Sequence, residues 1–214
     1  MRLLPREALI KTSELDYAEW NFSNLLGFIQ RMRFNLVVSL LSGHKFQRLL
    51  EVGYGSGIFM PELVLYCDEL YGIDLHHKEE LVSEALAKFN IPARLFHGSV
   101  AAMPFNSDYF DCIVAVSTLE FVEDADTACK EVKRVLKPGG IFIVIIPGGS
   151  PIVDLGLWVL TGKKANDVYG QRRESVMSTL PRHFTLSKKL LVPPYGNSVI
   201  CLYRGVKLLK SKLT

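Results

Sequence analysis

The sequence predicts a doubly wound α/β fold, in which helices cover both faces of a mostly parallel β-sheet and a helical extension precedes the sheet. Short apolar segments alternate with amphipathic helical segments between residues 48 and 146, which is the pattern of consecutive βαβ units. The segments 109–116 and 141–146 end in unbroken apolar runs, as expected of central parallel strands buried on both faces. A chain of 214 residues can bury one core of this kind.

The individual elements follow from the hydrophobic periodicity. An N-terminal helix is expected over 13–42, because apolar residues recur there every three or four positions until a Ser-Gly pair ends the pattern. Strands are expected at 48–53, 69–74, 93–98, 109–116 and 141–146, and helices at 58–66, 78–89 and 124–136. A turn is expected at 137–140. Beyond Pro147 the alternation ends, with a helical piece expected at 151–160 and one closing strand at 198–206.

The chain is expected to form a single α/β domain with two additions. Residues 1–47 are predicted to be an N-terminal helical cap, and residues 48–214 the α/β domain itself. The irregular segment 149–194 is predicted to be an insertion that contacts the substrate or acts as a lid.

Composition narrows the class of protein. The sequence is 49% hydrophobic and 22% charged, which is ordinary for a globular domain. No signal peptide is visible, and the longest apolar run is interrupted at Pro147 and Pro151, so no membrane-spanning helix is expected. Four scattered cysteines without metal-ligand spacing predict free thiols, no metal site and a cytoplasmic location.

Charge is distributed unevenly along the chain. Residues 151–214 contain eleven Lys and Arg residues against three acidic ones, a net charge of +8. Since the whole chain carries +3, residues 1–150 carry −5. Two interpretations remain open: a solvated basic face, or a surface that meets an anionic substrate, a phospholipid head group or nucleic acid. The sequence shows no clear nucleic-acid-binding motif.

The sharpest motif is Glu51-Val-Gly-Tyr-Gly-Ser-Gly57, directly after the first expected strand. Its glycines allow positive φ and close approach of the backbone to a ligand, and the helix that follows presents free N–H groups. Asp74 ends the second expected strand, where a carboxylate can accept hydrogen bonds from ribose hydroxyls. The two features together predict an adenosine-type site at the carboxyl ends of the strands.

Two classes of cofactor use such a site. The dinucleotide fingerprint G-x-G-x-x-G needs a third small residue where this chain has the bulky Ile58. Glu51 would repel a pyrophosphate, whereas it would attract the ammonium and sulfonium groups of S-adenosylmethionine. An NAD(P)-dependent oxidoreductase is therefore the less favoured alternative.

Five segments together resemble the class I S-adenosylmethionine-dependent methyltransferases of the methyltransferase type 11 kind. They are LLEVGYGSG at 49–57, YGID at 71–74, GSVAAMPF at 98–105, FDCIVAVSTLEF at 110–121 and LKPGGIFIV at 136–144. Each motif is weak alone, but their common order and spacing over about residues 48–148 is specific. The resemblance implies a Rossmann-like fold, S-adenosylmethionine as cofactor and S-adenosylhomocysteine as its product.

The resemblance also implies a set of cofactor-binding residues. The glycine loop and Glu51 would surround the methionine part, Asp74 would hold the ribose, and the end of the fourth strand would meet the methyl donor. Leu75 would pack against the adenine, whose edge would be bound near Ser99. The complete predicted set is Glu51, Gly53, Tyr54, Gly55, Gly57, Asp74, Leu75, Ser99, Val100 and Ser117.

This chain departs from the family pattern at two places. Relatives usually carry Asp at the position of Ser99, and a hydroxyl is a weaker acceptor than a carboxylate, so we expect weaker cofactor binding. Many relatives carry a histidine soon after the fourth strand, where this chain has Glu120 and Phe121. No catalytic residue is therefore assigned; Glu120 and His183 are candidates for a general base, and His76 is interpreted as part of a solvated helix start.

The leading hypothesis is methyl transfer from S-adenosylmethionine to a small-molecule or lipid-like acceptor. The mixture of apolar and cationic residues within 149–194 suits an amphipathic, anionic acceptor and peripheral contact with a membrane. The alternatives are a non-catalytic binding module with the methyltransferase fold and, less favoured, the oxidoreductase. The acceptor atom and the oligomeric state are not predicted.

Overall fold

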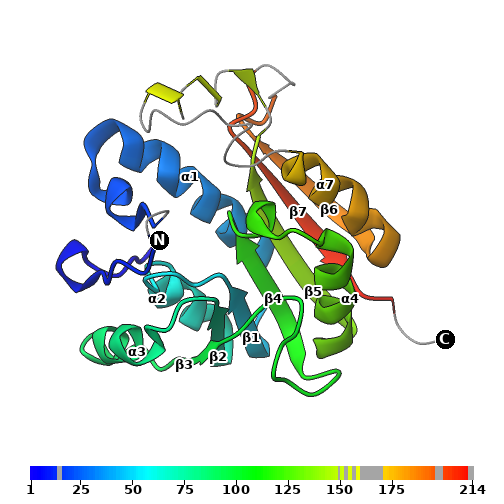
Figure 1. Ribbon diagram of the computed structural model, residues 1–214, viewed down its shortest axis with the longest axis horizontal. Helices are drawn as coiled ribbons and strands as arrows, with labels where there is room; N and C mark the ends of the chain where they lie inside the picture. The colour runs from blue at the N-terminus through cyan, green and yellow to red at the C-terminus, as the bar shows by residue number, and fades with distance from the viewer. Residues whose placement is uncertain are drawn as a thin grey trace.

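The computed structural model describes residues 1–13, 16–148, 150–151, 154–155, 158–159, 171–195 and 200–211. Within them, seven strands form one sheet in the order β3-β2-β1-β4-β5-β7-β6 (Figure 1). The strands are β1 Phe46–Val52, β2 Cys67–Asp74, β3 Arg94–His97, β4 Phe110–Val116, β5 Leu136–Pro147, β6 Thr185–Val192 and β7 Tyr203–Leu209. The first five pair in parallel, and β7 runs antiparallel between β5 and β6. The predicted doubly wound, mostly parallel fold is confirmed.

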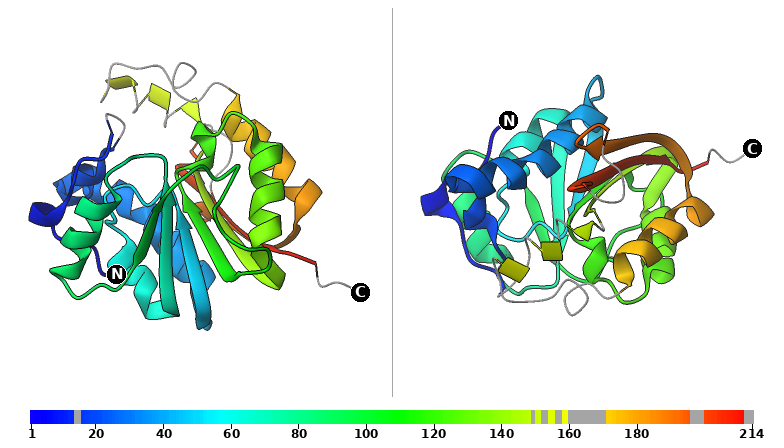
Figure 2. Two further views of the ribbon diagram at one scale, coloured as in Figure 1. Left: turned by 60° about the horizontal axis from the view of Figure 1, so that its bottom comes forward. Right: turned by 90° about the horizontal axis from the view of Figure 1, so that it is seen from above.

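Helices cover both faces of the sheet. The helices are α1 Asn24–Leu41, α2 Met60–Leu63, α3 Glu79–Ala87, α4 Ala125–Val135 and α7 Arg172–His183, with short 3-10 helices η1 Arg6–Ala8, η2 Ala18–Phe22, η3 Val64–Tyr66 and η4 Leu119–Phe121. In Figures 1 and 2, α1, α2 and α3 lie on one face and α4 and α7 on the other. Alternate residues of the central strands supply two cores, so that Ile143 packs under α1 and Val144 under α4.

The strand order creates the crevice in which a ligand can lie. The chain leaves β1 to form β2 on one side, and then returns to form β4 on the other side of β1. The register places Val52 of β1 beside Ile73 of β2 and Ala115 of β4. The carboxyl ends of these three strands therefore meet at the point where the order reverses, which is where open α/β sheets bind their ligands.

Two elements near the ends of the chain differ from the prediction. The N-terminal helix begins at Asn24 rather than at residue 13, because the hydroxyl of Ser23 accepts the N–H of Gly27 and caps it. The closing strand lies at Tyr203–Leu209, later than expected, and β6 is an additional strand that the sequence did not predict. As an exposed edge strand, β6 has no alternation of apolar and polar residues for a sequence pattern to detect.

The predicted turn at 137–140 lies inside β5, where Gly139 has a φ of +77° and its N–H bonds to the carbonyl of Lys210. Of the helix predicted at 151–160, residues 152–153, 156–157 and 160 lie outside the described residues, as do 161–170 and 196–199. In the described part of the chain, no helix has the length and apolar character needed to cross a membrane.

Candidate functional site

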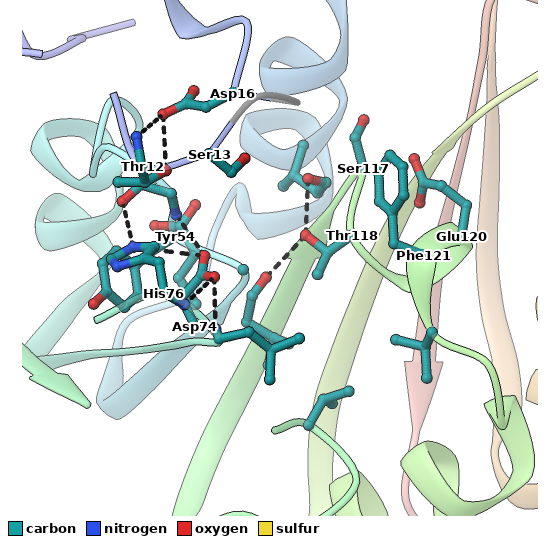
Figure 3. A pocket seen from close by; sticks show the side chains of 18 of the residues that line it. Thr12, Ser13, Asp16, Tyr54, Asp74, His76, Ser117, Thr118, Glu120 and Phe121 are labelled. Atoms are coloured by element: carbon teal, nitrogen blue, oxygen red, sulfur yellow. Dashed lines mark hydrogen bonds and ion pairs between the residues drawn. The ribbon is translucent and has the colours of Figure 1, made fainter. Parts of the chain in front are cut away.

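The crevice at the ends of β1, β2 and β4 opens into a cavity of about 1000 Å³. Figure 3 shows Tyr54 and Asp74 on one wall and Ser117 and Glu120 on the opposite wall. The N-terminal segment around Thr12 lies over the first wall. The cavity is thus bounded by the strand ends and by residues that precede the sheet in the sequence.

The glycine loop after β1 has the conformation that its sequence predicts. Gly53 and Gly55 have φ angles of +74° and +52°. A Cβ on Gly53 would lie 2.3 Å from Oγ1 of Thr118, so both the backbone angle and the close approach of the next wall require glycine there. Gly57 is not among the residues that line the cavity, and a Cβ on it would meet Val82 of α3 at 3.1 Å. Gly57 therefore packs the loop against α3 rather than facing the cavity.

The carboxylate of Asp74 lies directly against this loop. Its Oδ2 accepts the backbone N–H of Gly55 at 2.8 Å, and its Oδ1 accepts the N–H of Leu75 at 2.7 Å and, at 3.4 Å, that of His76. A carboxylate can accept about four hydrogen bonds, and the Asp74 side chain keeps 20% of its surface exposed. The Asp74 carboxylate can therefore still accept a hydrogen bond from a hydroxyl group of a ligand. Gly55 and Asp74 also lie at the same edge of the sheet, as a nucleoside site requires.

Two ionisable side chains of the first wall each have a buried oxygen without a hydrogen-bond partner among the described residues. Glu51 is 4% exposed, and its Oε2 has no hydrogen bond among the described residues. Burial, assisted by the negative charge of Asp74, raises the pKa of Glu51 to about 8, while the positive charge of Arg33 opposes the shift. The hydroxyl of Tyr54 is likewise buried and unpaired, and burial raises its pKa. A buried, unpaired carboxylate is costly, so this arrangement fits a ligand that brings a cation to Glu51.

The other predicted residues also line the cavity. Leu75 presents an apolar side chain that is 69% exposed. The Oγ of Ser99 accepts the N–H of Ala101 at 3.1 Å, so part of the hydrogen-bonding capacity of this hydroxyl is used within the chain. Ser117 follows β4 with a φ of +53°, and its buried hydroxyl has no partner in the described structure. Such backbone strain costs about 1–3 kcal/mol and is concentrated at functional sites.

The interpretation of His76 as part of a solvated helix start is wrong. The side chain is 8% exposed and lines the cavity, and α3 begins only at Glu79. Its Nδ1 accepts the N–H of Lys78 at 3.1 Å, so Nε2 carries the proton and donates it to the carbonyl of Gly55 at 3.0 Å. His76 thus fixes the glycine loop from the side of β2, a role that no sequence spacing indicates.

Residues that were not predicted from the sequence also reach the cavity from segments that precede the sheet. Asp16 accepts the hydroxyl of Thr12 at 2.9 Å and the N–H of Ala18 at 3.1 Å, which fixes the turn that leads into η2. Gln30 and Arg33 of α1 line the cavity as well. They stand three positions apart, on one face of a mostly apolar helix, and this spacing is the signal that could have identified them.

Of the two candidate bases, one lines the cavity. Glu120 lies in its wall, within η4. His183 does not line it; its Nε2 lies 2.7 Å from Oδ1 of Asp126 and joins α7 to α4. The structure therefore excludes His183 as a base in this cavity and assigns it to helix packing.

The comparisons with known proteins agree with this geometry. Residues 50–144 match the family model described as a methyltransferase domain. Residues 50–144 are thus similar to a methyltransferase domain over the part of the chain that carries the glycine loop and Asp74. The matched residues run from β1 into β5 and include the glycine loop, Asp74, Ser99 and Ser117.

Two curated relatives and one solved structure illustrate this likeness. A sterol 4-C-methyltransferase of Caenorhabditis elegans is 34% identical over 44% of this chain and 29% of its own length. A malonyl-[acyl-carrier protein] O-methyltransferase of Chlorobium luteolum is 30% identical over 54% of this chain and 47% of its own. The N-methyltransferase NodS of Bradyrhizobium japonicum, solved with S-adenosylhomocysteine, superimposes with a TM-score of 0.65 at 17% identity, covering 94% of both chains. The chain spans less than half the length of these two curated relatives.

Proposed function

We propose that this protein transfers the methyl group of S-adenosylmethionine to a small-molecule or lipid-like acceptor. The observation that carries the proposal is the contact between the Gly55 N–H and the Asp74 carboxylate at 2.8 Å, which sets the glycine loop and the acidic strand end at one cavity. The unpaired, buried carboxylate of Glu51 in the same wall supports a ligand with a positive charge. A pyrophosphate bound at the same place would be repelled by the carboxylate of Glu51.

The residues of the first wall take complementary roles in this proposal. Glu51 would pair with the ammonium group of the methionine part, and the backbone of Gly53 and Gly55 would approach it closely. Asp74 would accept the ribose hydroxyls, and the exposed Leu75 would pack against the adenine. The list of proposed cofactor contacts is completed by Tyr54, Ser99, Val100 and Ser117. When bound, S-adenosylmethionine supplies a methyl group on a sulfonium whose leaving group is a neutral thioether, so positioning and exclusion of water are the main tasks left to the protein.

Calorimetry with S-adenosylhomocysteine and with NADH tests the proposal directly. We expect saturable binding of S-adenosylhomocysteine with one site per chain and no binding of NADH. The buried Ile58, 7% exposed, fills the position at which a dinucleotide site needs a small residue. Binding of NADH in place of S-adenosylhomocysteine would favour the oxidoreductase, and binding of neither would refute a nucleoside site.

The acceptor side of the proposal concerns residues 1–47 and 149–194. We propose that the first segment acts as a helical cap, since η2 and α1 line the cavity, and that the second contacts the acceptor. Exposed apolar side chains at Leu155 and Trp158 support an amphipathic acceptor or a membrane surface. Flotation with vesicles of phosphatidylcholine and phosphatidylglycerol at low salt tests this: we expect binding that salt reverses, and no binding would restrict the acceptor to soluble molecules.

A further inference from the structure

The half of the cavity that the cofactor does not explain has its own set of side chains. It is lined by Tyr17, Trp20, Arg33, Phe34, Glu120 and Tyr203, which we call the acceptor chamber. These residues come from η2 or the residue before it, α1, η4 and β7. The inference that follows rests on the proposed methyl transfer and concerns the chemical class of the acceptor.

Glu120 is the central observation in this chamber. Its side chain is 0% exposed, and neither of its carboxylate oxygens has a hydrogen-bond partner of normal geometry among the described residues. Burial raises the pKa of Glu120 to about 8, against its own backbone N–H and the positive charges of Arg33 and Arg173. Because buried polar groups are almost always paired, an acid left in this state in a cavity wall points to a partner that arrives with the ligand.

Arg33 supplies the opposite charge in the same chamber. Burial raises the pKa values of Glu51, Glu120 and Tyr203, and the positive charge of Arg33 opposes each of these shifts. No ion pair within 4.0 Å joins Arg33 to any carboxylate of the described residues, and its Nε is buried without a hydrogen bond. The guanidinium lines the cavity, lies 4.8 Å from the ring centroid of Phe34, and is not neutralised by a direct ion pair with any carboxylate of the described residues.

The charges of Arg33 and of ionised Glu120 restrict which methyl acceptors can react between these two side chains. An ammonium acceptor would be opposed by Arg33, and a carboxylate acceptor would be opposed by Glu120 once that group is ionised. A neutral hydroxyl satisfies both, since its proton can move to Glu120 while the negative charge that develops on oxygen lies near Arg33. The walls favour an aromatic ring, because the aromatic side chains of Tyr17, Trp20 and Phe34 line the chamber.

We propose that the acceptor is a neutral aromatic hydroxyl and that Glu120 is the catalytic residue that takes its proton. In the transfer step the hydroxyl oxygen forms a bond to the methyl carbon, while the carbon–sulfur bond breaks and its electron pair stays on sulfur. The hydroxyl proton passes to a carboxylate oxygen of Glu120. The products are a methyl aryl ether, the neutral thioether S-adenosylhomocysteine and a protonated Glu120.

The first test measures binding and needs no turnover. The probes are 2-naphthol, 2-naphthoate and 2-naphthylmethylamine, which share one ring system and differ in charge, and they are titrated into protein saturated with S-adenosylhomocysteine. Above pH 8, where Glu120 is ionised, we expect 2-naphthol to bind about tenfold more tightly than either charged probe. Glu120→Gln should weaken 2-naphthol about tenfold, whereas Glu84→Gln on the exposed side of α3 should change nothing.

A second variant keeps the test valid if Glu120→Gln does not fold. Arg33→Met removes the cation, so it should weaken 2-naphthol and strengthen the ammonium probe until the preference is reversed. A charged probe that binds wild type as tightly as 2-naphthol would overturn the proposal. Failure of S-adenosylhomocysteine itself to bind would instead refute the methyltransferase function, so the two failures are distinguishable.

The role of Glu120 as a base is tested by methylation of 2-naphthol. We expect wild-type kcat to rise with pH through about 8, as Glu120 becomes ionised. Glu120→Gln should lower kcat about 100-fold or more, flatten that profile and leave the Kd of S-adenosylhomocysteine unchanged. Equal kcat in the two proteins, or binding of 2-naphthol to wild type without methylation, would overturn the assignment.

Discussion

The two halves of the cavity are built in different ways. The cofactor half is made from strand ends and a glycine loop that lie close together in sequence, and much of its surface is backbone held by Asp74 and His76. The acceptor chamber is made from side chains that four distant segments bring together. The cofactor half holds the buried acid Glu51, and the acceptor chamber holds the buried acid Glu120. The comparison suggests that the first half is specified by backbone geometry and the second by charge and shape.

The largest expected effect concerns the backbone of the cofactor half. Gly53→Ala introduces a Cβ 2.3 Å from Thr118 Oγ1 at a φ of +74°, and strain plus overpacking should lower the free energy of unfolding by about 3 kcal/mol. Gly43→Ala is the matched control, since Gly43 has a φ of +79° with nothing within 4 Å, and it should cost about 1 kcal/mol. Urea unfolding measures both. Equal losses would show that close approach at Gly53 does not matter.

The next effect concerns the carboxylate at the end of β2. Asp74→Asn should weaken S-adenosylhomocysteine about 100-fold, because two charge-assisted hydrogen bonds to the ribose are lost at roughly 1.5 kcal/mol each. Asp111→Asn is the control: that carboxylate accepts the N–H of Arg48 at 2.8 Å and pairs with Lys137 at 2.7 Å, outside the cavity. Asp111→Asn should lower the free energy of unfolding and change the Kd of S-adenosylhomocysteine by less than twofold. Calorimetry that showed equal affinity losses would place the ribose elsewhere.

A third prediction compares the buried acids of the two halves through pH. The pKa values of Glu51 and Glu120 are raised from 4.5 to about 8. Between these pH values the folded state holds protons that the unfolded state has released, so each acid reduces stability as pH rises from about 4.5 to 8. The free energies of unfolding of Glu51→Gln and of Glu120→Gln should each exceed that of wild type by about 1–2 kcal/mol at pH 8. At pH 5 the difference should be smaller.

The same pair of variants separates the two halves by binding. Glu51→Gln should weaken S-adenosylhomocysteine at least tenfold, because a charged partner for the ammonium is lost, whereas Glu120→Gln should leave it within twofold. Urea unfolding at several pH values and calorimetry provide the measurements, with Glu84→Gln as the control for both. If Glu120→Gln weakened S-adenosylhomocysteine as much as Glu51→Gln, the division of the cavity into two halves would be wrong.

The difference between the halves also explains what the sequence could predict. The parallel strands were predictable because burial on both faces leaves apolar runs such as those in β4 and β5. The cofactor half was predictable because its geometry depends on glycines and a strand-end acid at fixed spacing. The exposed edge strand β6 has no such run, since its burial is one-sided and slight.

Glu120 was identified as a candidate base, but the rest of the acceptor chamber was not predicted from local patterns. Arg33 is one of only two charged residues of α1, beside Arg31, and only the packing of α1 over the sheet turns it toward the cavity. His76 follows the strand and would be expected in solvent, but its hydrogen bonds to Lys78 and Gly55 draw it inward. Chemistry that depends on side chains from distant segments becomes visible when the fold is known.

The smallest expected effect tests the adenine end of the cofactor half. Ser99→Asp should strengthen S-adenosylhomocysteine about three- to tenfold, because a carboxylate is a stronger acceptor for the adenine amino group than a hydroxyl that already accepts the N–H of Ala101. S-inosylhomocysteine, which has an oxygen in place of that amino group, is the matched ligand and should gain nothing or bind more weakly. Ser99→Ala should lose about threefold or less. Calorimetry with both ligands measures the effect. An equal gain for the two ligands would mean that the new carboxylate acts by rigidifying the loop at 98–102 and that the adenine edge lies elsewhere.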